Sequence, residues 1–123
     1  KSAALVVERI HQRTHDDPCV VMGDFNVGET NPALLYLKGK AGPEGVKPSK
    51  TPLVDTFRVL HPQATDVGTF NGFRGRKTGN KIDYILAQPE TKVIESAIVE
   101  TAYDGRYPSD HFPVSAVLRW GGP

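Results

Sequence analysis

The chain has 123 residues, a length that fits a single domain. Hydrophobic residues make up 38% of it and charged residues 24%, proportions that argue against a disordered chain or a coiled coil. The 15 basic and 14 acidic side chains leave a formal net charge of +1, which excludes a strongly basic protein that coats polyanions but not a local phosphate site. The single cysteine, Cys19, excludes an internal disulfide framework.

The first elements in chain order are a helix and a strand. Apolar side chains with helical spacing predict a helix over residues 2–13, and these side chains are Ala4, Leu5, Val7 (or Val6) and Ile10. The helix must end before Pro18, because the residue that precedes a proline avoids helical backbone angles. The apolar run over residues 19–22 then predicts a short buried strand that ends at residues 23–26.

Two further helices are predicted in the next forty residues. Pro32 fits the first turn of a helix over residues 32–38, and Thr30 or Asn31 would cap it. The composition of residues 39–52 is that of a loop. The next group of apolar side chains again has helical spacing, and it consists of Leu53, Val54, Phe57 and Leu60.

The second half of the chain predicts short strands separated by loops. The strand candidates are Thr69-Phe70 and residues 81–87, 92–101 and 113–120. The loops between them are residues 71–80, which are rich in glycine and positive charge, and residues 103–109. The element order predicts an α/β (α+β) layered fold, and no linker divides the chain into two domains.

Three polar clusters lie where a predicted strand meets a loop. They are Gly23-Asp24-Phe25-Asn26, Lys81-Ile82-Asp83-Tyr84 and Ser109-Asp110-His111-Phe112-Pro113. Each has an ordinary structural explanation when it is taken alone. The first and third clusters could form turns, since aspartate and asparagine side chains bond their own backbone. Asp83 could form a buried salt bridge with a lysine or arginine.

Together, the three clusters favour a metal-assisted phosphoryl hydrolase. Carboxylate oxygens select Mg²⁺ or Mn²⁺, and the chain has no cysteine and histidine spacing for zinc. A histidine can protonate or hydrogen-bond a phosphate oxygen near neutral pH, and a carboxylate on its other nitrogen fixes its tautomer.

The same motifs resemble the C-terminal half of the endonuclease/exonuclease/phosphatase superfamily, the DNase I-like group. A Gly-Asp-x-Asn strand end, an Ile-Asp-Tyr strand and a terminal Ser-Asp-His-x-Pro-Val occur here in the family's order. The segment Thr69-Phe70-Asn71-Gly72-Phe73 also resembles the one that precedes the Asp-Tyr strand in bacterial members.

The resemblance implies a role for each matching residue. His111 would be the catalytic histidine and Asp83 its orienting partner. Asp24 would activate the attacking water or transfer a proton, and it would contact the metal with Asp110. Asn26 would donate to a phosphate oxygen as negative charge develops. The implied cofactor is Mg²⁺ (or Mn²⁺), and the implied reaction is in-line attack of water on phosphorus.

The resemblance also implies a fold and a boundary. Residues 1–123 would form the C-terminal half of a DNase I-like four-layer α/β sandwich, as one mixed β-sheet with helices on its outer face. The N-terminal half, which normally supplies the main metal-binding glutamate, would be absent. We therefore expect poor metal affinity, an exposed apolar inner sheet face, and a homodimer formed through that face.

Two functions stay open on this evidence. The first is a metal-dependent hydrolase of phosphate esters, either a phosphodiesterase or nuclease or a phosphatase. The second is a catalytically incomplete half-domain with a binding or structural role. The substrate could be nucleic acid, a sugar phosphate or a phospholipid headgroup. The chain has neither a signal peptide nor an apolar run long enough to span a membrane, which favours the cytoplasm.

The glycine-rich loop offers further candidates for substrate binding. Arg74 and Arg76, with Lys77 and Lys81, are the best candidates for a phosphate contact, and a solvated loop is the alternative. Phe70 and Phe73 are expected to pack in the core, although they could also stack on a base or face a lipid.

Overall fold

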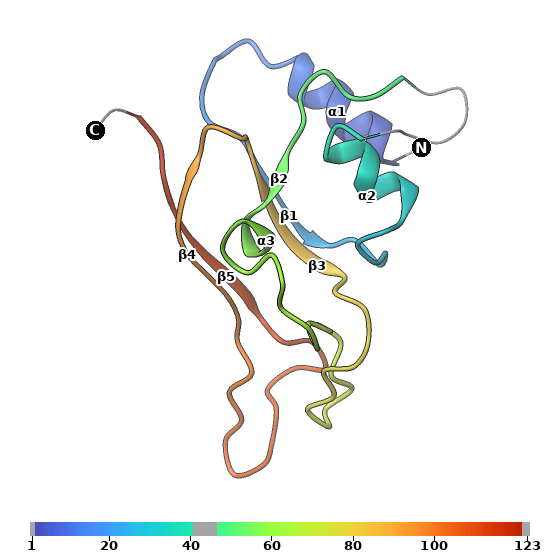
Figure 1. The fold of residues 1–123 in the computed structure, drawn as a ribbon, viewed down its shortest axis with the longest axis vertical. Helices are drawn as coiled ribbons and strands as arrows, with labels where there is room; N and C mark the ends of the chain where they lie inside the picture. The colour runs from blue at the N-terminus through green and yellow to red at the C-terminus, as the bar shows by residue number, and fades with distance from the viewer. Residues whose placement is uncertain (1, 41–46, 122–123) are drawn as a thin grey trace.

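The computed structural model describes residues 2–40 and 47–121, so part of the predicted loop over residues 39–52 lies outside the described residues. The elements in chain order are α1 (Ser2–His11), β1 (Val20–Asp24), α2 (Pro32–Leu37), β2 (Val54–Asp55), α3 (Thr56–Leu60), β3 (Asp83–Ala87), β4 (Lys92–Ile98) and β5 (Val114–Arg119) (Figure 1). The expected mixture of helices and strands is confirmed. None of the described helices has the length and apolar character that crossing a membrane requires.

The strands form two hydrogen-bonded sheets. One has three strands in the order β1-β3-β2, and the other is the pair β4-β5 (Figure 1). Every described pairing is antiparallel. The prediction of one mixed sheet is therefore wrong in this respect. The reason is that β3 lies between β1 and β2 and runs opposite to both, so the two strands that share a direction are never neighbours.

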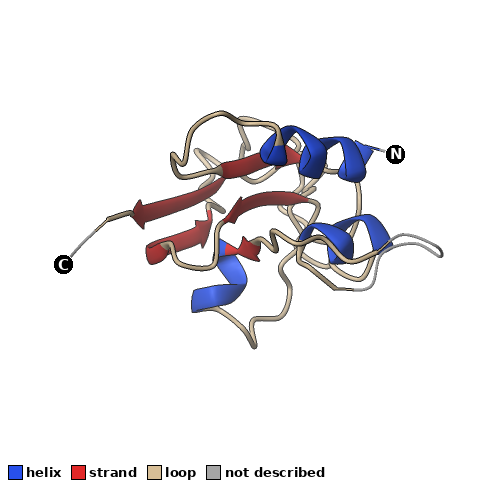
Figure 2. Cartoon of the chain, turned by 90° about the horizontal axis from the view of Figure 1, so that it is seen from above, coloured by secondary structure: helices blue, strands red, loops and turns tan. Residues whose placement is uncertain are grey.

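The core lies on one face of the three-stranded sheet, under the helices. Tyr84 and Leu86 of β3 point into a buried cluster with residues of α1 and α2, namely Val7, Leu34, Tyr36 and Leu37. Leu53 completes this cluster. Figure 2 shows α1 and α2 together at one end and α3 against another part of the strands. The helices α1 and α2, which supply residues to the cluster around Tyr84, thus pack on the same face of the sheet.

The opposite face of the same sheet is open. Met22 faces Ile85 across β1 and β3, and Asp24 faces Asp83, so these four side chains share a face. Met22 is 71% exposed. This agrees only in part with the expected apolar inner face, because Asp24 and Asp83 share the face with Met22 and Ile85. The structure of one chain gives no support to the expected homodimer, which stays a prediction.

The first helix buries only part of the predicted stripe, namely Val7 (or Val6) and Ile10. Ala4 and Leu5 are exposed, and the side that packs on the core carries Ala3, Val6, Val7 and Ile10. These four residues have the spacing i, i+3, i+4, i+7, which forms a continuous helical face. The helix also ends at His11, two residues before the predicted limit.

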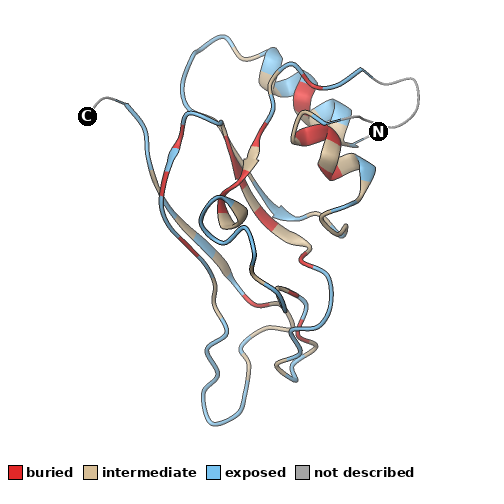
Figure 3. Cartoon of the chain, in the orientation of Figure 1, coloured by how far each residue is buried: buried red, intermediate tan, exposed pale blue. Residues whose placement is uncertain are grey.

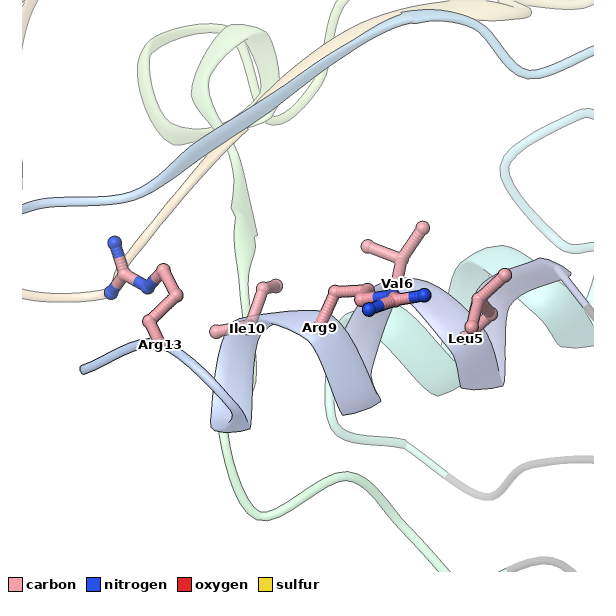
Figure 4. Close-up of a pocket in the computed structure, with 5 residues that line it drawn as sticks. All are labelled: Leu5, Val6, Arg9, Ile10 and Arg13. Atoms are coloured by element: carbon pink, nitrogen blue, oxygen red, sulfur yellow. The ribbon is translucent and has the colours of Figure 1, made fainter.

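A surface pocket of about 340 Å³ runs along α1 (Figure 4). Its lining residues are Leu5, Val6, Arg9, Ile10 and Arg13. None of these residues belongs to the three polar clusters, so this pocket contributes nothing to the candidate site below.

The predicted helix around Phe57 begins later than its apolar spacing suggests. Val54 and Asp55 form the strand β2, which pairs with β3, and helix α3 begins at Thr56. The Asp55 side chain caps this helix, because its Oδ1 accepts the N–H of Phe57 at 3.1 Å. Apolar spacing alone could not distinguish the last strand residues from the first helix residues.

Asp55 also forms a buried ion pair, with Lys81. The Lys81 Nζ atom lies 2.8 Å from Asp55 Oδ2, and both side chains are 1% exposed. The same Nζ lies 3.8 Å from the centre of the Tyr84 ring. Burial lowers the pKa of Lys81, and the Asp55 charge opposes this change. Lys81 is therefore a structural residue, and its assignment to an exposed phosphate-binding loop is wrong.

The pair β4-β5 carries alternating side chains, as predicted. Val114, Ala116 and Leu118 of β5 are half-buried, and the residues between them are exposed (Figure 3). Helix α3 packs on this pair, where a ring nitrogen of His61 lies 2.7 Å from the carbonyl oxygen of Ser96. The two sheets are thus joined through α3 and through the segment that precedes β5.

Candidate active site

The site begins with two carboxylates on neighbouring strands. Asp24 is the last residue of β1 and Asp83 is the first residue of β3, and the antiparallel register places them directly opposite each other. Their side chains lie on the open face of the sheet. Asp24 is 37% exposed and Asp83 is 14% exposed, so Asp24 is the more accessible of the two.

His111 connects these two carboxylates. Its Nδ1 lies 2.8 Å from Asp83 Oδ2, a hydrogen bond in which the imidazole N–H donates. Its Nε2 lies 3.9 Å from Asp24 Oδ2. The partner of Asp83 is therefore a histidine, rather than the lysine or arginine of the alternative interpretation. This bond fixes the ring orientation and leaves Nε2 turned toward Asp24 and solvent.

The turn after β1 is a local turn held by Asp24, and it also lies at the candidate site. The N–H of Asn26 donates to Asp24 Oδ1 at 2.8 Å, and Asn26 has a φ of 53°. This is the local turn expected of an aspartate at a strand end. Because Oδ1 is used in the turn, Oδ2 is the oxygen that faces His111. The exposed Asn26 side chain lies two residues from Asp24, at the same edge of the sheet.

Thr69 joins the segments that carry Asp83 and His111. Its Oγ1 accepts the N–H groups of Ile82 at 3.0 Å and Asp83 at 3.1 Å. Its carbonyl oxygen accepts the N–H of Phe112 at 2.7 Å. Thr69 is fully buried, with 0% exposure. One side chain and one carbonyl thus hold the backbones on both sides of the Asp83–His111 hydrogen bond.

Asn71 fixes the turn that contains Asp110. Its backbone N–H donates to the Asp110 carbonyl at 2.7 Å, and its side-chain Nδ2 donates to the Ser109 carbonyl at 3.2 Å. The Ser109 hydroxyl in turn accepts the N–H of His111 at 3.1 Å. Sequence reasoning singled out neither Thr69 nor Asn71 for a role. Only the resemblance of the segment 69–73 to a family motif pointed to them.

The structure groups three of the candidate residues. Ligand atoms of Asp24, Asp83 and His111 all lie within 4.8 Å of one another. Asp110 precedes His111 in the chain, and within the described residues its carboxylate is not part of this group of three. Arg74 and Arg76 are exposed on the glycine-rich loop, where Arg76 Nε donates to Thr78 Oγ1 at 3.2 Å. Lys77 pairs with Glu100.

The surroundings of His111 favour its cationic form. The hydrogen bond with Asp83 raises the pKa of His111 above the ordinary value of 6.5. Partial burial opposes this rise, and the negative charges of Asp83, Asp24 and Asp110 add to it. The ring is therefore able to carry a positive charge toward a phosphate oxygen at a higher pH than a free histidine can.

Replacement of Asp83 with asparagine should lower the pKa of His111, because it removes the negative charge that receives the imidazole N–H. Titration of the His111 ring protons by NMR, without divalent ions, measures this change. In the wild type, the stability that the pair contributes should be full below pH 6.5 and be lost as the pH rises through the raised pKa. An unchanged pKa in the variant would contradict this description of the site.

Replacement of Thr69 with valine should destabilise the protein by about 1–3 kcal/mol, because the N–H groups of Ile82 and Asp83 lose their buried acceptor. Valine keeps the shape of threonine but lacks the hydroxyl. Urea unfolding measures the free energy, and Thr69→Ser, which keeps the hydroxyl, is the matched control. If valine and serine had the same effect, the hydroxyl would not be what holds these segments.

The donor atoms of the site fit a magnesium or manganese ion. A pocket of about 300 Å³ opens over Asp24, Asp83 and His111. Asp83 Oδ2 is engaged by His111, whereas Asp24 Oδ2 faces the pocket. Mg²⁺ is commonly held by one or two carboxylates, with water and substrate phosphate completing its shell. Asp24 supplies an oxygen donor of this kind, whereas Asp110 does not line this pocket. The expected low affinity stays a prediction.

Comparisons with known proteins agree with this geometry. The sequence model of the Endonuclease/Exonuclease/phosphatase family matches residues 3–111. A mannosyl-6-phosphatase from Bacteroides thetaiotaomicron VPI-5482 has a similar structure, with a TM-score of 0.72 and 26% identity over 97% of this chain and 45% of that one. An endonuclease/exonuclease/phosphatase family protein from Bacteroides thetaiotaomicron gives 0.73 and 28% over 95% and 43%.

A third structure, a conserved protein of unknown function from Enterococcus faecalis V583, has a TM-score of 0.69 and 27% identity over 94% of this chain and 42% of that one. The chain thus spans less than half the length of each of these structures. The expected α+β class and the likeness to part of a DNase I-like domain are confirmed.

Proposed function

We propose that this chain, which belongs to the endonuclease/exonuclease/phosphatase family, carries the histidine and aspartate part of a metal-dependent site that hydrolyses phosphate esters. On this proposal, residues 1–123 are the C-terminal half of the family's domain. The observation that carries the proposal is the arrangement of His111 between two carboxylates, with Nδ1 bonded to Asp83 and Nε2 turned to Asp24.

Each side chain has a distinct task in this proposal. Asp83 holds the His111 ring, which presents its Nε2 proton to an oxygen of the phosphate. Asp24 Oδ2 takes a proton from the attacking water. The bond from water oxygen to phosphorus forms as the opposite ester bond breaks, and the leaving oxygen receives a proton from solvent. Asn26 and the arginines Arg74 and Arg76 donate to the other phosphate oxygens.

A divalent ion completes this chemistry. Asp24 and Asp110 would hold Mg²⁺ or Mn²⁺, which would supply a positive charge to the phosphate oxygens as negative charge develops. On this proposal, the chain's own cationic groups supply part of the same stabilisation. A cation at Asp24 also favours the carboxylate form of that residue, in which it accepts a proton from water.

A small sugar phosphate is the substrate class that we favour. One similar structure is a mannosyl-6-phosphatase, whose name describes a phosphatase acting on a sugar phosphate. The net charge of +1 gives no support to a long groove for nucleic acid within this chain. A nuclease or a phospholipid headgroup hydrolase remains an outcome of the test below.

A catalytically incomplete half-domain is the second candidate. Two observations favour it: the chain covers 45% or less of the similar structures, and Met22 is exposed beside Asp24. A further pocket, of about 580 Å³, lies between α1, β1 and α2 and also borders Asp24. On this view, the exposed apolar face binds the remainder of a longer protein.

Hydrolysis of three phosphate esters decides between these candidates. Mannose 6-phosphate, bis(4-nitrophenyl) phosphate and a short oligonucleotide should be incubated with the chain and Mg²⁺ or Mn²⁺, with EDTA as the control. We expect metal-dependent release of phosphate from mannose 6-phosphate. Cleavage of only the diesters would favour a phosphodiesterase or nuclease, and no cleavage of any ester would favour the incomplete half-domain.

A further inference from the structure

Phe70 and Phe73 do not line the pocket over the candidate site. Phe70 is 45% exposed and Phe73 is 60% exposed, so the prediction that both rings pack in the core is wrong. The other loop next to the site, residues 25–31, follows Asp24 directly and is held by buried and half-buried side chains.

The loop over residues 25–31 determines how the Asp24 carboxylate is oriented. The Asn26 N–H donates to Asp24 Oδ1 at 2.8 Å, and Asn26 forms this bond with a left-handed φ of 53°. Because Oδ1 is held in this way, Oδ2 is the oxygen that lies 3.9 Å from His111 Nε2. A shift of this loop would therefore change the direction in which Oδ2 points.

Glu29 joins this loop to helix α3 through Arg58. The pair is bidentate, because Arg58 Nε lies 2.8 Å from Glu29 Oε2 and Nη2 lies 2.7 Å from Oε1. Arg58 Nη1 also donates to the carbonyl oxygens of His61 at 3.1 Å and Ala64 at 2.8 Å. The hydrogen bond from Arg58 lowers the pKa of Glu29, so its carboxylate stays charged. Bidentate pairs of this kind fix direction as well as distance.

Tyr84 holds the same loop from the side of β3. Its hydroxyl lies 2.9 Å from the carbonyl oxygen of Val27 and 2.6 Å from that of Lys81, and both oxygens accept from it. Tyr84 is only 1% exposed. Because Tyr84 directly follows Asp83 in β3, one side chain links the loop after Asp24 to the strand that carries Asp83.

Helix α3, which carries Arg58, is itself anchored to the segment before Asp83. Asp55 caps the helix and forms the buried ion pair with Lys81, two residues before Asp83. Neither Glu29 nor Arg58 lines the pocket over the candidate site. Their effect on chemistry in that pocket therefore has to pass through the loop that they hold.

We propose that Glu29, Arg58 and Tyr84 are positioning residues of this site. They hold residues 25–31 in place, so that the Asn26 N–H keeps its bond to Asp24 Oδ1 and Asp24 Oδ2 stays directed at the attacking water. The proposal rests on the proposed function, because it names the residues that orient the proton acceptor of the same site. None of the three contacts the substrate.

Steady-state kinetics of Glu29→Gln with mannose 6-phosphate and Mg²⁺ tests the proposal. Glutamine keeps the size of the side chain but removes the charge that binds Arg58 in a bidentate pair. We expect kcat to fall by about 10–100-fold, which is the usual cost of losing a group that orients a reacting side chain. KM should change by less than about 3-fold, because the loss affects the transition state. A rise in KM with an unchanged kcat would overturn the proposal.

The double variant Asn26→Ala/Glu29→Gln separates positioning from general damage to the fold. If Glu29 acts through the loop turn, adding Glu29→Gln to Asn26→Ala should lower kcat by less than about 3-fold further, since residues that act as a unit have non-additive effects. Tyr84→Phe, which removes only the hydroxyl, should behave in the same way. Equal losses with and without Asn26→Ala would mean a merely structural role and would overturn the proposal.

Glu8→Gln is the matched control, because it makes the same substitution at a carboxylate outside the site. Glu8 is exposed on α1, where its Oε1 accepts from Gln12 Nε2 at 2.9 Å. We expect kcat of Glu8→Gln to equal that of the wild type, and an equal loss in Glu8→Gln and Glu29→Gln would overturn the proposal. Arg58→Lys keeps the positive charge but not the bidentate geometry, so it should lower kcat as Glu29→Gln does.

Amide hydrogen exchange separates failure of this proposal from failure of the proposed function. If the wild type hydrolyses no ester, the proposed function fails, and NMR then measures exchange of the Asn26 N–H relative to that of the buried Leu86 N–H. This ratio corrects for changes in global stability. We expect it to rise by about 10-fold or more in Glu29→Gln and to stay unchanged in Glu8→Gln. The same ratio in the wild type and Glu29→Gln would show that Glu29 does not hold the loop and would overturn the proposal.

Discussion

Replacement of His111 with alanine is expected to lower the metal-dependent rate of phosphate release by about 10²–10⁴-fold, which is the usual contribution of a positioned general acid or base. His111 is the only candidate side chain that contacts both Asp83 and Asp24 within the described residues. Its loss removes the proton donor to phosphate and leaves Asp83 without its partner. The measurement is kcat with mannose 6-phosphate and Mg²⁺.

The double variant Asp83→Ala/His111→Ala sharpens this test. If Asp83 acts by holding His111, removing it from the His111→Ala protein should cause little further loss, because residues that act as a unit have non-additive effects. His15→Ala is the control, since His15 is exposed and its ring lies at hydrogen-bonding distance from Thr14, away from the three polar clusters in the sequence. Multiplicative losses in the double variant would mean that Asp83 acts independently of His111.

Replacement of Asp55 with alanine is expected to destabilise the fold by about 3–5 kcal/mol, because it leaves Lys81 buried and without its counter-charge. Lys81 is two residues before Asp83, and its carbonyl oxygen accepts the Tyr84 hydroxyl at 2.6 Å. The loss of the ion pair should therefore disturb the strand that carries Asp83. Urea unfolding monitored by circular dichroism measures the change in free energy.

Two further variants separate the charge from the packing at this pair. The double variant Asp55→Leu/Lys81→Met should recover most of the lost stability, because apolar residues of similar volume replace buried ion pairs well. Glu100→Ala removes the partner of Lys77 in an exposed pair, and it should cause no measurable change. If Glu100→Ala changed the free energy of unfolding strongly, or Asp55→Ala changed it little, burial would not be what makes the Asp55–Lys81 pair important for stability.

The elements that the sequence predicted well are those with a strong local signal. Pro32 and Asn31 defined the start of α2, where Asn31 Oδ1 accepts the N–H of Ala33 at 2.9 Å. The alternation in β5 was also correct. In α1, Val7 (or Val6) and Ile10 were predicted correctly, whereas Ala4 and Leu5 were not, because they satisfy a helical pattern as well as Ala3 does. Only packing against the core decides between them.

The site was predicted in part for a similar reason. Asp24 and Asp83 lie at the ends of β1 and β3, which antiparallel pairing brings together. His111 precedes β5 in the other sheet, so its proximity to them was implied by the family resemblance of the three motifs and not by strand pairing. The roles of Thr69 and Asn71 depend on long-range hydrogen bonds, which no local pattern announces. Lys81 was misassigned for the opposite reason. The other cations considered with it, Arg74, Arg76 and Lys77, are exposed, whereas its partner Asp55 is 26 residues away.

The most direct test of the account is the incorporation of solvent oxygen into the released phosphate. The wild type and His111→Ala should be incubated with mannose 6-phosphate and Mg²⁺ or Mn²⁺ in water enriched in oxygen-18. Mass spectrometry then measures how many oxygen-18 atoms the released phosphate contains. We predict one labelled oxygen per phosphate with the wild type and only the uncatalysed background with the variant. Equal labelling by both proteins, or labelling by neither, would contradict a hydrolytic site at Asp24, Asp83 and His111.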